Sequence, residues 1–139
     1  MSKTKIHTAE EYAQQVISGE VLVCEYVRLA VERYYRDLDV ALDRGWHFDR
    51  KAASRAINFI QKLKHTKGVW AGQRFKLEPW QQFIIWNIFG WMNADGTRRF
   101  RYAYIEISRK NGKTMLSAST GLLMLFADGE SRPEVYSAA

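Results

Sequence analysis

The sequence has little of what would indicate a secreted, metal-binding or membrane-spanning protein. Its 139 residues include one cysteine, Cys24, which excludes an internal disulfide, and no Cys/His spacing resembles a metal site. The N-terminus has no apolar signal region. No run reaches the roughly 18 apolar residues that a membrane span requires. We therefore expect a soluble protein of a reducing, intracellular compartment that has no membrane partner.

The composition is that of a folded domain with a basic surface. Hydrophobic residues make up 47% of the chain and aromatic residues 14%, which is enough to bury a core. The formal net charge of +6 suggests an anionic partner such as a nucleic acid or a nucleotide. A solvated basic surface would give the same total, so the charge alone does not identify the partner.

The first part of the chain carries three helical patterns. Thr8 with Glu11 three residues later forms a capping box, which predicts that a short helix starts there. Tyr34 would lie on the inner face of the second helix, and Asp49 would cap the third. The expected helices cover residues 9–18, residues from 23 until Gly45 stops the helix, and residues 50–63.

A basic stretch follows the third helix. Gly68 and Gly72 break it, which is typical of a loop. Clustered lysine and arginine side chains can contact phosphates without reading sequence, so this stretch is a candidate DNA-facing strip. A solvated loop explains it equally well. Its cationic side chains are those of Lys62, Lys64, Lys67, Arg74 and Lys76.

A further helix is expected from Pro79 to Gly90. Proline suits the first position of a helix because an N–H at that position has no partner within the helix, so proline loses no hydrogen bond there. The helical spacing of the apolar residues predicts one buried face. That face would include Trp80, Phe83, Ile84 and Ile88.

Residues 100–126 have the layout of a phosphate-binding loop. Aromatic and β-branched residues from Phe100 to Ile107 predict a strand, a basic turn closes on Gly112, and an apolar helix follows. Lys113 could reach terminal phosphates and Thr114 could help to hold Mg²⁺. The full pattern requires a glycine five residues before Gly112, where Ile107 stands. An ordinary basic strand-to-helix turn with a solvated lysine is the alternative.

A second strand is expected over residues 134–139. The fold class predicted is α/β: a helical region over residues 1–72, then an incomplete P-loop NTPase unit over residues 73–139, with a parallel sheet. Unpaired sheet edges would favour self-association. After Thr114, the acidic residues Asp128, Glu130 and Glu134 all lie in or beside a turn. Because hydrolysis also needs a carboxylate on a later strand, we expect the first part of a larger enzyme.

Two motifs together resemble a known family. Leu77–Gln81, followed about 30 residues later by Ser108–Thr114, resembles the N-terminal half of the large terminase subunit of tailed bacteriophages. That subunit is the ATP-driven motor that packages DNA into the prohead. Terminases use a phosphate loop that has an arginine and lacks the first glycine. The resemblance implies ATP and Mg²⁺ as cofactors. It implies double-stranded DNA, the small terminase subunit and the portal as partners, and a phage or prophage protein in the bacterial cytoplasm.

The resemblance also assigns residue roles. Gln81 would recognise the adenine edge and Thr114 would hold Mg²⁺. Arg109 would be the catalytic residue, sensing or stabilising the γ-phosphate, although a salt bridge to an acidic side chain is the alternative. The residues that would bind ATP are Gln81, Asn111, Gly112, Lys113 and Thr114.

A function of a different class remains open. The chain could be a non-catalytic basic helical module that binds nucleic acid through its lysine and arginine strips. If it is instead the opening part of the packaging ATPase, it should bind ATP but hydrolyse it poorly alone. Under the resemblance, the acidic Mg²⁺-binding strand and the nuclease domain of the family would lie beyond Ala139.

Overall fold

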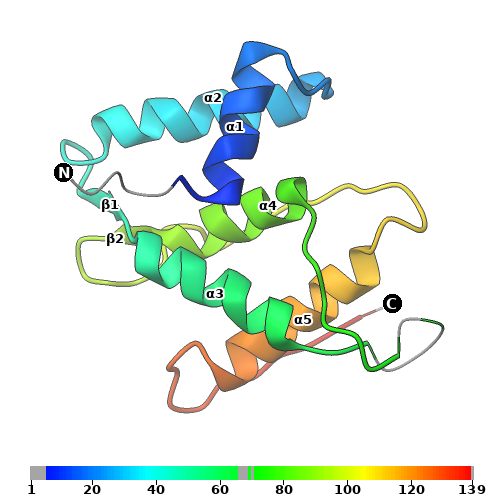
Figure 1. Ribbon diagram of the computed structural model, residues 1–139. Helices are drawn as coiled ribbons and strands as arrows, with labels where there is room; N and C mark the ends of the chain where they lie inside the picture. Colours follow the sequence, from blue (N-terminus) through cyan, green and yellow to red (C-terminus); the bar gives the residue numbers. More distant parts are fainter. Residues whose placement is uncertain (1–5, 66–68, 70, 139) are drawn as a thin grey trace.

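The computed structural model describes residues 6–65, 69 and 71–138. Within these residues it contains five helices and a two-stranded antiparallel sheet (Figure 1). No helix of this described part is long and apolar enough to span a bilayer. The elements in chain order are α1 (Thr8–Ser18), α2 (Glu25–Val40), β1 (Trp46–Phe48), α3 (Arg50–Lys62), α4 (Pro79–Gly90), β2 (Trp91–Asn93) and α5 (Lys113–Phe126).

Helix α4 forms the centre of the fold, where it packs against both α1 and α3 (Figure 1). The prediction of a single apolar face was wrong. Trp80, Ile84 and Ile88 are only half-buried, while residues on other sides of the helix are buried as well. A helix with apolar residues all round is stable only where neighbours cover it on several sides. The buried residues of α4 are Gln81, Gln82, Phe83, Ile85, Trp86, Phe89 and Gly90.

The predicted helices are confirmed, with small shifts at their starts. The cap of α1 is His7, whose Nδ1 accepts a hydrogen bond from the Ala9 N–H at 3.1 Å. Glu10 closes the capping box by accepting from the His7 N–H at 3.0 Å. The predicted box of Thr8 and Glu11 is therefore one residue out, because an imidazole nitrogen replaces the expected hydroxyl. Asp49 caps α3 as predicted.

The inner face of α2 carries a buried acid that the helical pattern did not predict. Asp37 is 5% exposed and forms an ion pair with Arg99 at 2.8 Å. The Arg99 guanidinium also lies 3.5 Å from the Trp46 ring centroid and 4.8 Å from that of Phe100. A buried carboxylate of this kind is stable only when paired. The pair fastens the segment after β2 to α2.

The short sheet lies at the junction of the helices. β1 and β2 pair antiparallel, with Trp46 opposite Asn93 and Phe48 opposite Trp91. This pairing joins the start of α3 to the end of α4. The predicted parallel sheet around the basic turn is not present in the described part of the chain.

The segment from Phe100 to Ile107 does not form the predicted strand. It runs as a long connection from β2 to α5, and no backbone hydrogen bond joins it to another described residue (Figure 1). Tyr102 and Tyr104 are 92% and 89% exposed. Residues 134–138 also form no strand, and Ala139 lies outside the described residues. Strands are stabilised by pairing, and neither segment has a paired neighbour here.

The basic stretch after α3 is partly a hairpin. Lys64 and Arg74 form an antiparallel bridge, and the Phe75 N–H donates to the Leu63 carbonyl at 2.9 Å. Lys67 and Gly68 of the predicted loop lie outside the described residues. The bridge extends the basic surface of α3 beyond the end of the helix.

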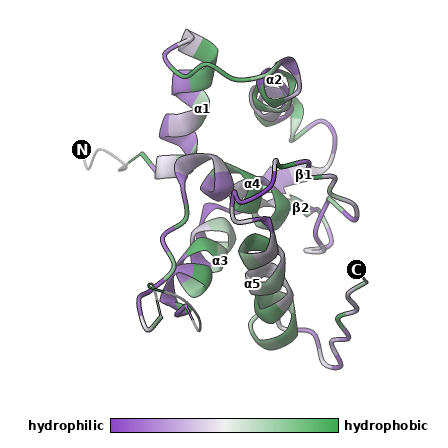
Figure 2. Ribbon diagram, turned by 90° about the vertical axis from the view of Figure 1, so that its right-hand side faces the viewer, coloured by the Kyte–Doolittle hydropathy of each residue, from purple (hydrophilic) through white to green (hydrophobic). Residues whose placement is uncertain are grey.

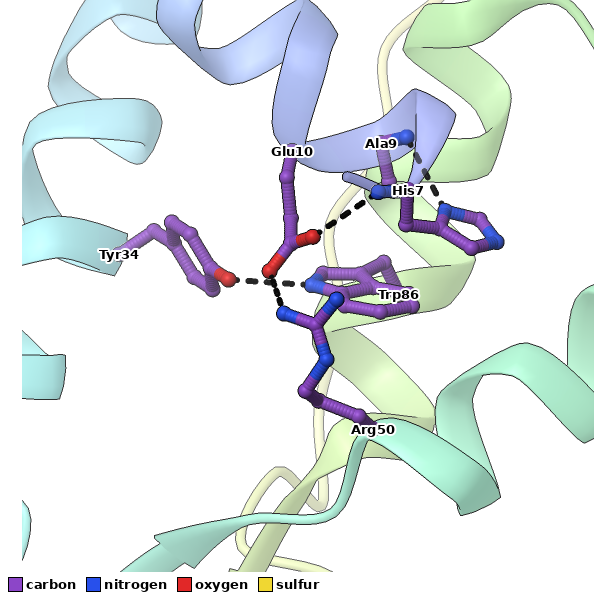
Figure 3. A network of polar contacts seen from close by, with 6 residues as sticks. All are labelled: His7, Ala9, Glu10, Tyr34, Arg50 and Trp86. Atoms are coloured by element: carbon purple, nitrogen blue, oxygen red, sulfur yellow. Dashed lines mark hydrogen bonds and ion pairs between the residues drawn. The ribbon is translucent and has the colours of Figure 1, made fainter. Parts of the chain in front are cut away.

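A polar network joins α1, α2, α3 and α4 (Figure 3). Glu10 pairs with Arg50, whose guanidinium lies 5.5 Å from the Trp86 ring centroid. The Trp86 indole N–H donates to the Tyr34 hydroxyl at 3.1 Å, and the His7 ring stacks on Trp86 at 4.4 Å. Trp86 is fully buried, so these contacts fix the position of α4 relative to its neighbours.

Stability should depend on the protonation of His7. Burial lowers the pKa of His7 from 6.5, with Glu10 opposing this effect and Arg50 adding to it. A lowered pKa means that the unfolded chain binds the proton more readily than the folded chain. The contribution of neutral His7 to the free energy of unfolding is therefore present above pH 6.5 and is lost as the pH falls below it. We expect the melting temperature to decrease between about pH 7 and about pH 5.5.

The variant His7→Asn provides the control for this prediction. Asparagine keeps an acceptor at the helix cap but does not titrate. The other two histidines are unchanged, so the difference between the two melting profiles isolates His7. Identical pH profiles for the two proteins would show that His7 protonation does not affect stability.

Candidate functional site

The basic turn before α5 has an unusual backbone. Lys110 has a φ of 65° and Gly112 a φ of 76°, both in the left-handed region. Within the turn, the Asn111 side-chain amide donates to the Ser108 hydroxyl. Glycine tolerates this region at no steric cost, whereas lysine is uncommon there. The turn is therefore a specific structure that reverses the chain directly into α5.

The start of α5 is open to an anion. Gly112 precedes the helix without any side-chain cap, and no acidic residue lies in the first turn. The Leu116 N–H donates to the Gly112 carbonyl at 2.9 Å. The N–H groups before it have no partner within the helix, and the helix dipole makes this end positive. Backbone groups at this end could thus bind a phosphate.

Gln81 lies beside this turn although it is far away in the sequence. A Cβ placed on Gly112 would be 3.1 Å from the Gln81 Nε2 atom. The Gln81 Oε1 atom accepts from the Glu78 N–H at 2.9 Å, which orients the side-chain amide. Gln81 is 9% exposed and so is held firmly in α4. Its amino group is the part of the side chain that faces the turn.

The remaining predicted site residues are exposed around the turn. Arg109, Asn111, Lys113 and Thr114 are all accessible to solvent. Among the described residues, Arg109 has no carboxylate within ion-pair distance, so the structure does not show the salt bridge considered as its alternative role. No group of three or more potential metal ligands occurs among the described residues. Thr114 alone would have to share a cation with the ligand's own oxygens.

One large cavity is separate from most of these residues. It measures about 950 Å³ and lies between α4, the segment after β2 and α5. Of the predicted site residues only Lys113 lines it. The other lining residues include Ile85, Phe89, Phe100, Ile107 and Leu116. The cavity is thus the apolar space beside the unpaired segment, not a pocket shaped by the turn.

Two ion pairs that the sequence did not predict fasten the chain segments before the turn and after α5. Asp37 and Arg99 hold the segment before it, and Arg98 pairs with Asp128 just after α5. The sequence signals for these pairs were the adjacent residues Arg98 and Arg99 before the predicted strand, and the acid Asp37 on the inner face of α2. Neither signal identifies its partner, because the paired residues are far apart in the sequence.

The comparison with protein families gives a match over the part of the chain that contains the basic turn. Residues 79–139 match the family described as terminase large subunit, ATPase domain. Searches of the curated proteins and of the solved structures gave no match. The matched range starts at Pro79 of α4 and includes Gln81, the basic turn and α5. The match of residues 79–139 to the ATPase domain of the terminase large subunit supports the family resemblance that the two sequence motifs indicated.

Proposed function

We propose that this chain is the ATP-binding, N-terminal portion of a DNA-packaging motor, with a helical region over residues 1–72 and the ATPase portion over residues 73–139. One observation carries the proposal. The open N-terminus of α5 lies next to the Gln81 amide, inside the segment that matches the terminase ATPase family. An uncapped helix start suits phosphates and a side-chain amide suits a base edge.

Each exposed side chain has a role that fits its chemistry. The backbone of Asn111 and Gly112 would donate to phosphate oxygens, and the Lys113 ammonium would contact the terminal phosphates. The Thr114 hydroxyl would contribute one ligand to Mg²⁺, which the phosphates and water would complete. Arg109, which is exposed in the turn, would stabilise charge on the γ-phosphate and so act as the catalytic residue.

We expect slow hydrolysis by this chain alone. Asp128 pairs with Arg98, and Glu134 accepts a hydrogen bond from the Tyr136 hydroxyl at 2.6 Å. Neither carboxylate is thereby directed at the turn. In-line attack by water needs an oriented base as well as bound phosphates. The chain therefore provides the binding half of an ATPase site.

ATP binding and the role of Gln81 can be tested together. Titration of the protein with ATP and Mg²⁺ by calorimetry should show binding. Gln81→Ala should weaken it about 3- to 10-fold, the value of one neutral hydrogen bond. Gln82→Ala is not a suitable control because Gln82 donates to the Leu77 carbonyl inside the core. Gln73→Ala is suitable, because Gln73 is exposed and lies outside the matched segment.

The outcomes separate binding from turnover. No ATP binding by the unmodified protein would refute the proposal, and an unchanged affinity in Gln81→Ala would remove only the assigned role of Gln81. Phosphate release at a robust rate without added protein would show that a carboxylate of this chain supports hydrolysis.

The partners follow from the family and remain part of the proposal. Double-stranded DNA is the cargo of a packaging motor, and the small subunit and portal would be its protein partners. Exposed apolar side chains along α5 also favour self-association, and Figure 2 shows this helix as largely hydrophobic. The exposed apolar residues of α5 are Met115, Leu122, Met124, Leu125 and Phe126.

The alternative is a basic helical module that binds nucleic acid without nucleotide. It is favoured by one feature, the absence of acidic residues from α3. Under this alternative, DNA affinity would persist without any measurable ATP binding. The two functions differ in their response to ATP, so the titration above also discriminates between them.

A further inference from the structure

The outer face of α3 carries a straight row of polar and cationic side chains. Lys51, Arg55, Asn58 and Lys62 recur at helical spacing, and all four are exposed. We call this row the α3 basic stripe. The opposite face of the helix is buried through Ala53, Ala56, Ile57 and Ile60. In Figure 1, α3 lies at the front of the molecule and no segment passes in front of it.

The positive charges of the stripe are not neutralised by neighbours. Helix α3 contains no acidic residue. Within the described part of the chain, Lys51, Arg55 and Lys62 form no ion pair. By contrast, Arg50 at the start of the helix is paired with Glu10. Three uncompensated cations in one row produce a local positive field that attracts a polyanion.

The dimensions of the stripe suit a row of phosphates. At about 1.5 Å per residue, the distance from Lys51 to Lys62 along the helix axis is about 16 Å. One strand of duplex DNA places a phosphate every ~3.4 Å along its axis, so the stripe could span about five of them. A shallow groove of about 530 Å³ follows this face, and Ser54 and Asn58 add hydrogen-bonding groups to its lining.

The groove favours a backbone contact over base stacking. Phe59 lines it but is half-buried and packs against the core, so it does not offer a free ring face. Proteins that bind single strands commonly stack bases on exposed aromatic rings. The hairpin bridge between Lys64 and Arg74 extends the basic surface beyond the C-terminal end of the stripe.

We propose that the α3 basic stripe binds the sugar-phosphate backbone of double-stranded DNA without sequence preference. This inference deepens the DNA part of the proposed function by assigning it to a surface. It does not require Lys113 or the turn before α5. The stripe and the proposed nucleotide site can therefore be disabled separately.

The test compares variants of the whole chain. A labelled duplex of about 30 base pairs is titrated by fluorescence polarisation between about 50 and about 200 mM salt. The variant Lys51→Gln/Arg55→Gln/Lys62→Gln should bind at least about 10-fold more weakly, and its salt slope should decrease by about three. The control Arg44→Gln/Arg101→Gln/Arg132→Gln removes the same charge from exposed positions elsewhere that form no ion pair in the described part of the chain, and it should retain most of the affinity.

A second variant protects the test against misfolding. Asn58→Asp introduces one negative charge into the middle of the stripe at an exposed position, and it should also weaken DNA binding. Equal losses in the stripe variant and the control would overturn the proposal, since only net charge would then matter. Competition by polyglutamate as effective as that by duplex DNA, or preferential binding of a single strand, would also overturn it.

Parallel titrations distinguish this inference from the proposed function. Lys113→Ala should bind DNA as the unmodified protein does. ATP binding without stripe-dependent DNA binding would refute the inference alone. DNA binding through the stripe without ATP binding would support the inference and refute the nucleotide proposal.

Discussion

Lys113→Ala is expected to reduce Mg²⁺-dependent ATP affinity about 10- to 100-fold. The ammonium of Lys113 extends from the first residue of α5, where no other side chain caps the helix. A charge-assisted hydrogen bond to phosphate contributes about 1.5–3 kcal/mol, and each 1.4 kcal/mol changes affinity about tenfold. Alanine is a better helix former than lysine, so the helix should remain intact. Calorimetric titration with ATP measures the effect directly.

A second lysine provides the control for charge. Lys76 is exposed and precedes the segment that matches the ATPase family, so Lys76→Ala should bind ATP normally. Lys113→Arg keeps the charge but replaces a compact ammonium with a planar group, and should restore affinity only in part. If Lys113→Ala binds ATP as tightly as the unmodified protein, the proposed nucleotide site is refuted.

Gly90→Ala is expected to destabilise the fold by about 2–3 kcal/mol. A Cβ at this position would overlap three atoms of the Phe48 ring. Phe48 cannot move easily because its ring packs against Trp86 at 5.2 Å and Trp91 at 5.2 Å. Replacing a glycine within a helix would ordinarily stabilise by about 1 kcal/mol, and the steric overlap exceeds that gain. Urea unfolding followed by circular dichroism measures the change.

Gly121→Ala is the matched control for this substitution. Gly121 also lies within a helix, and its added Cβ would be 3.4 Å from Val135 Cγ1, an ordinary contact. This variant should be neutral or slightly stabilised. Combining Gly90→Ala with Phe48→Leu should recover part of the loss, because the smaller side chain leaves room for the methyl group. A stable Gly90→Ala protein would contradict the packing described around Phe48.

The helices could be predicted from the sequence because their signals are local. Asp49 and Pro79 mark helix starts through interactions within one turn, and the structure places α3 and α4 where they predict. The shift from Thr8 to His7 at the start of α1 arises because histidine can replace a hydroxyl as the acceptor. Local chemistry determines such boundaries to within about a residue or two.

The pairing of distant segments could not be predicted in the same way. The pattern of residues 100–107 has the composition of a strand, but a strand also needs a partner, and pattern alone cannot supply one. The ion pair of Asp37 with Arg99 likewise joins residues that no periodicity relates. Both Gln81 and Gly112 were assigned to one site by family resemblance alone. The structure adds that they are neighbours.

The two parts of the proposed nucleotide site differ in how rigidly the fold holds them. Gln81 lies on the most enclosed helix of the fold, whereas Lys113 follows a segment without backbone pairing. A nucleotide that bridges them would restrict the second part, so some of its binding free energy would offset the lost conformational entropy. Any partner that first pairs with residues 100–107 would remove that cost and raise the affinity for ATP. Because such coupling is reciprocal, bound ATP would equally strengthen the binding of that partner.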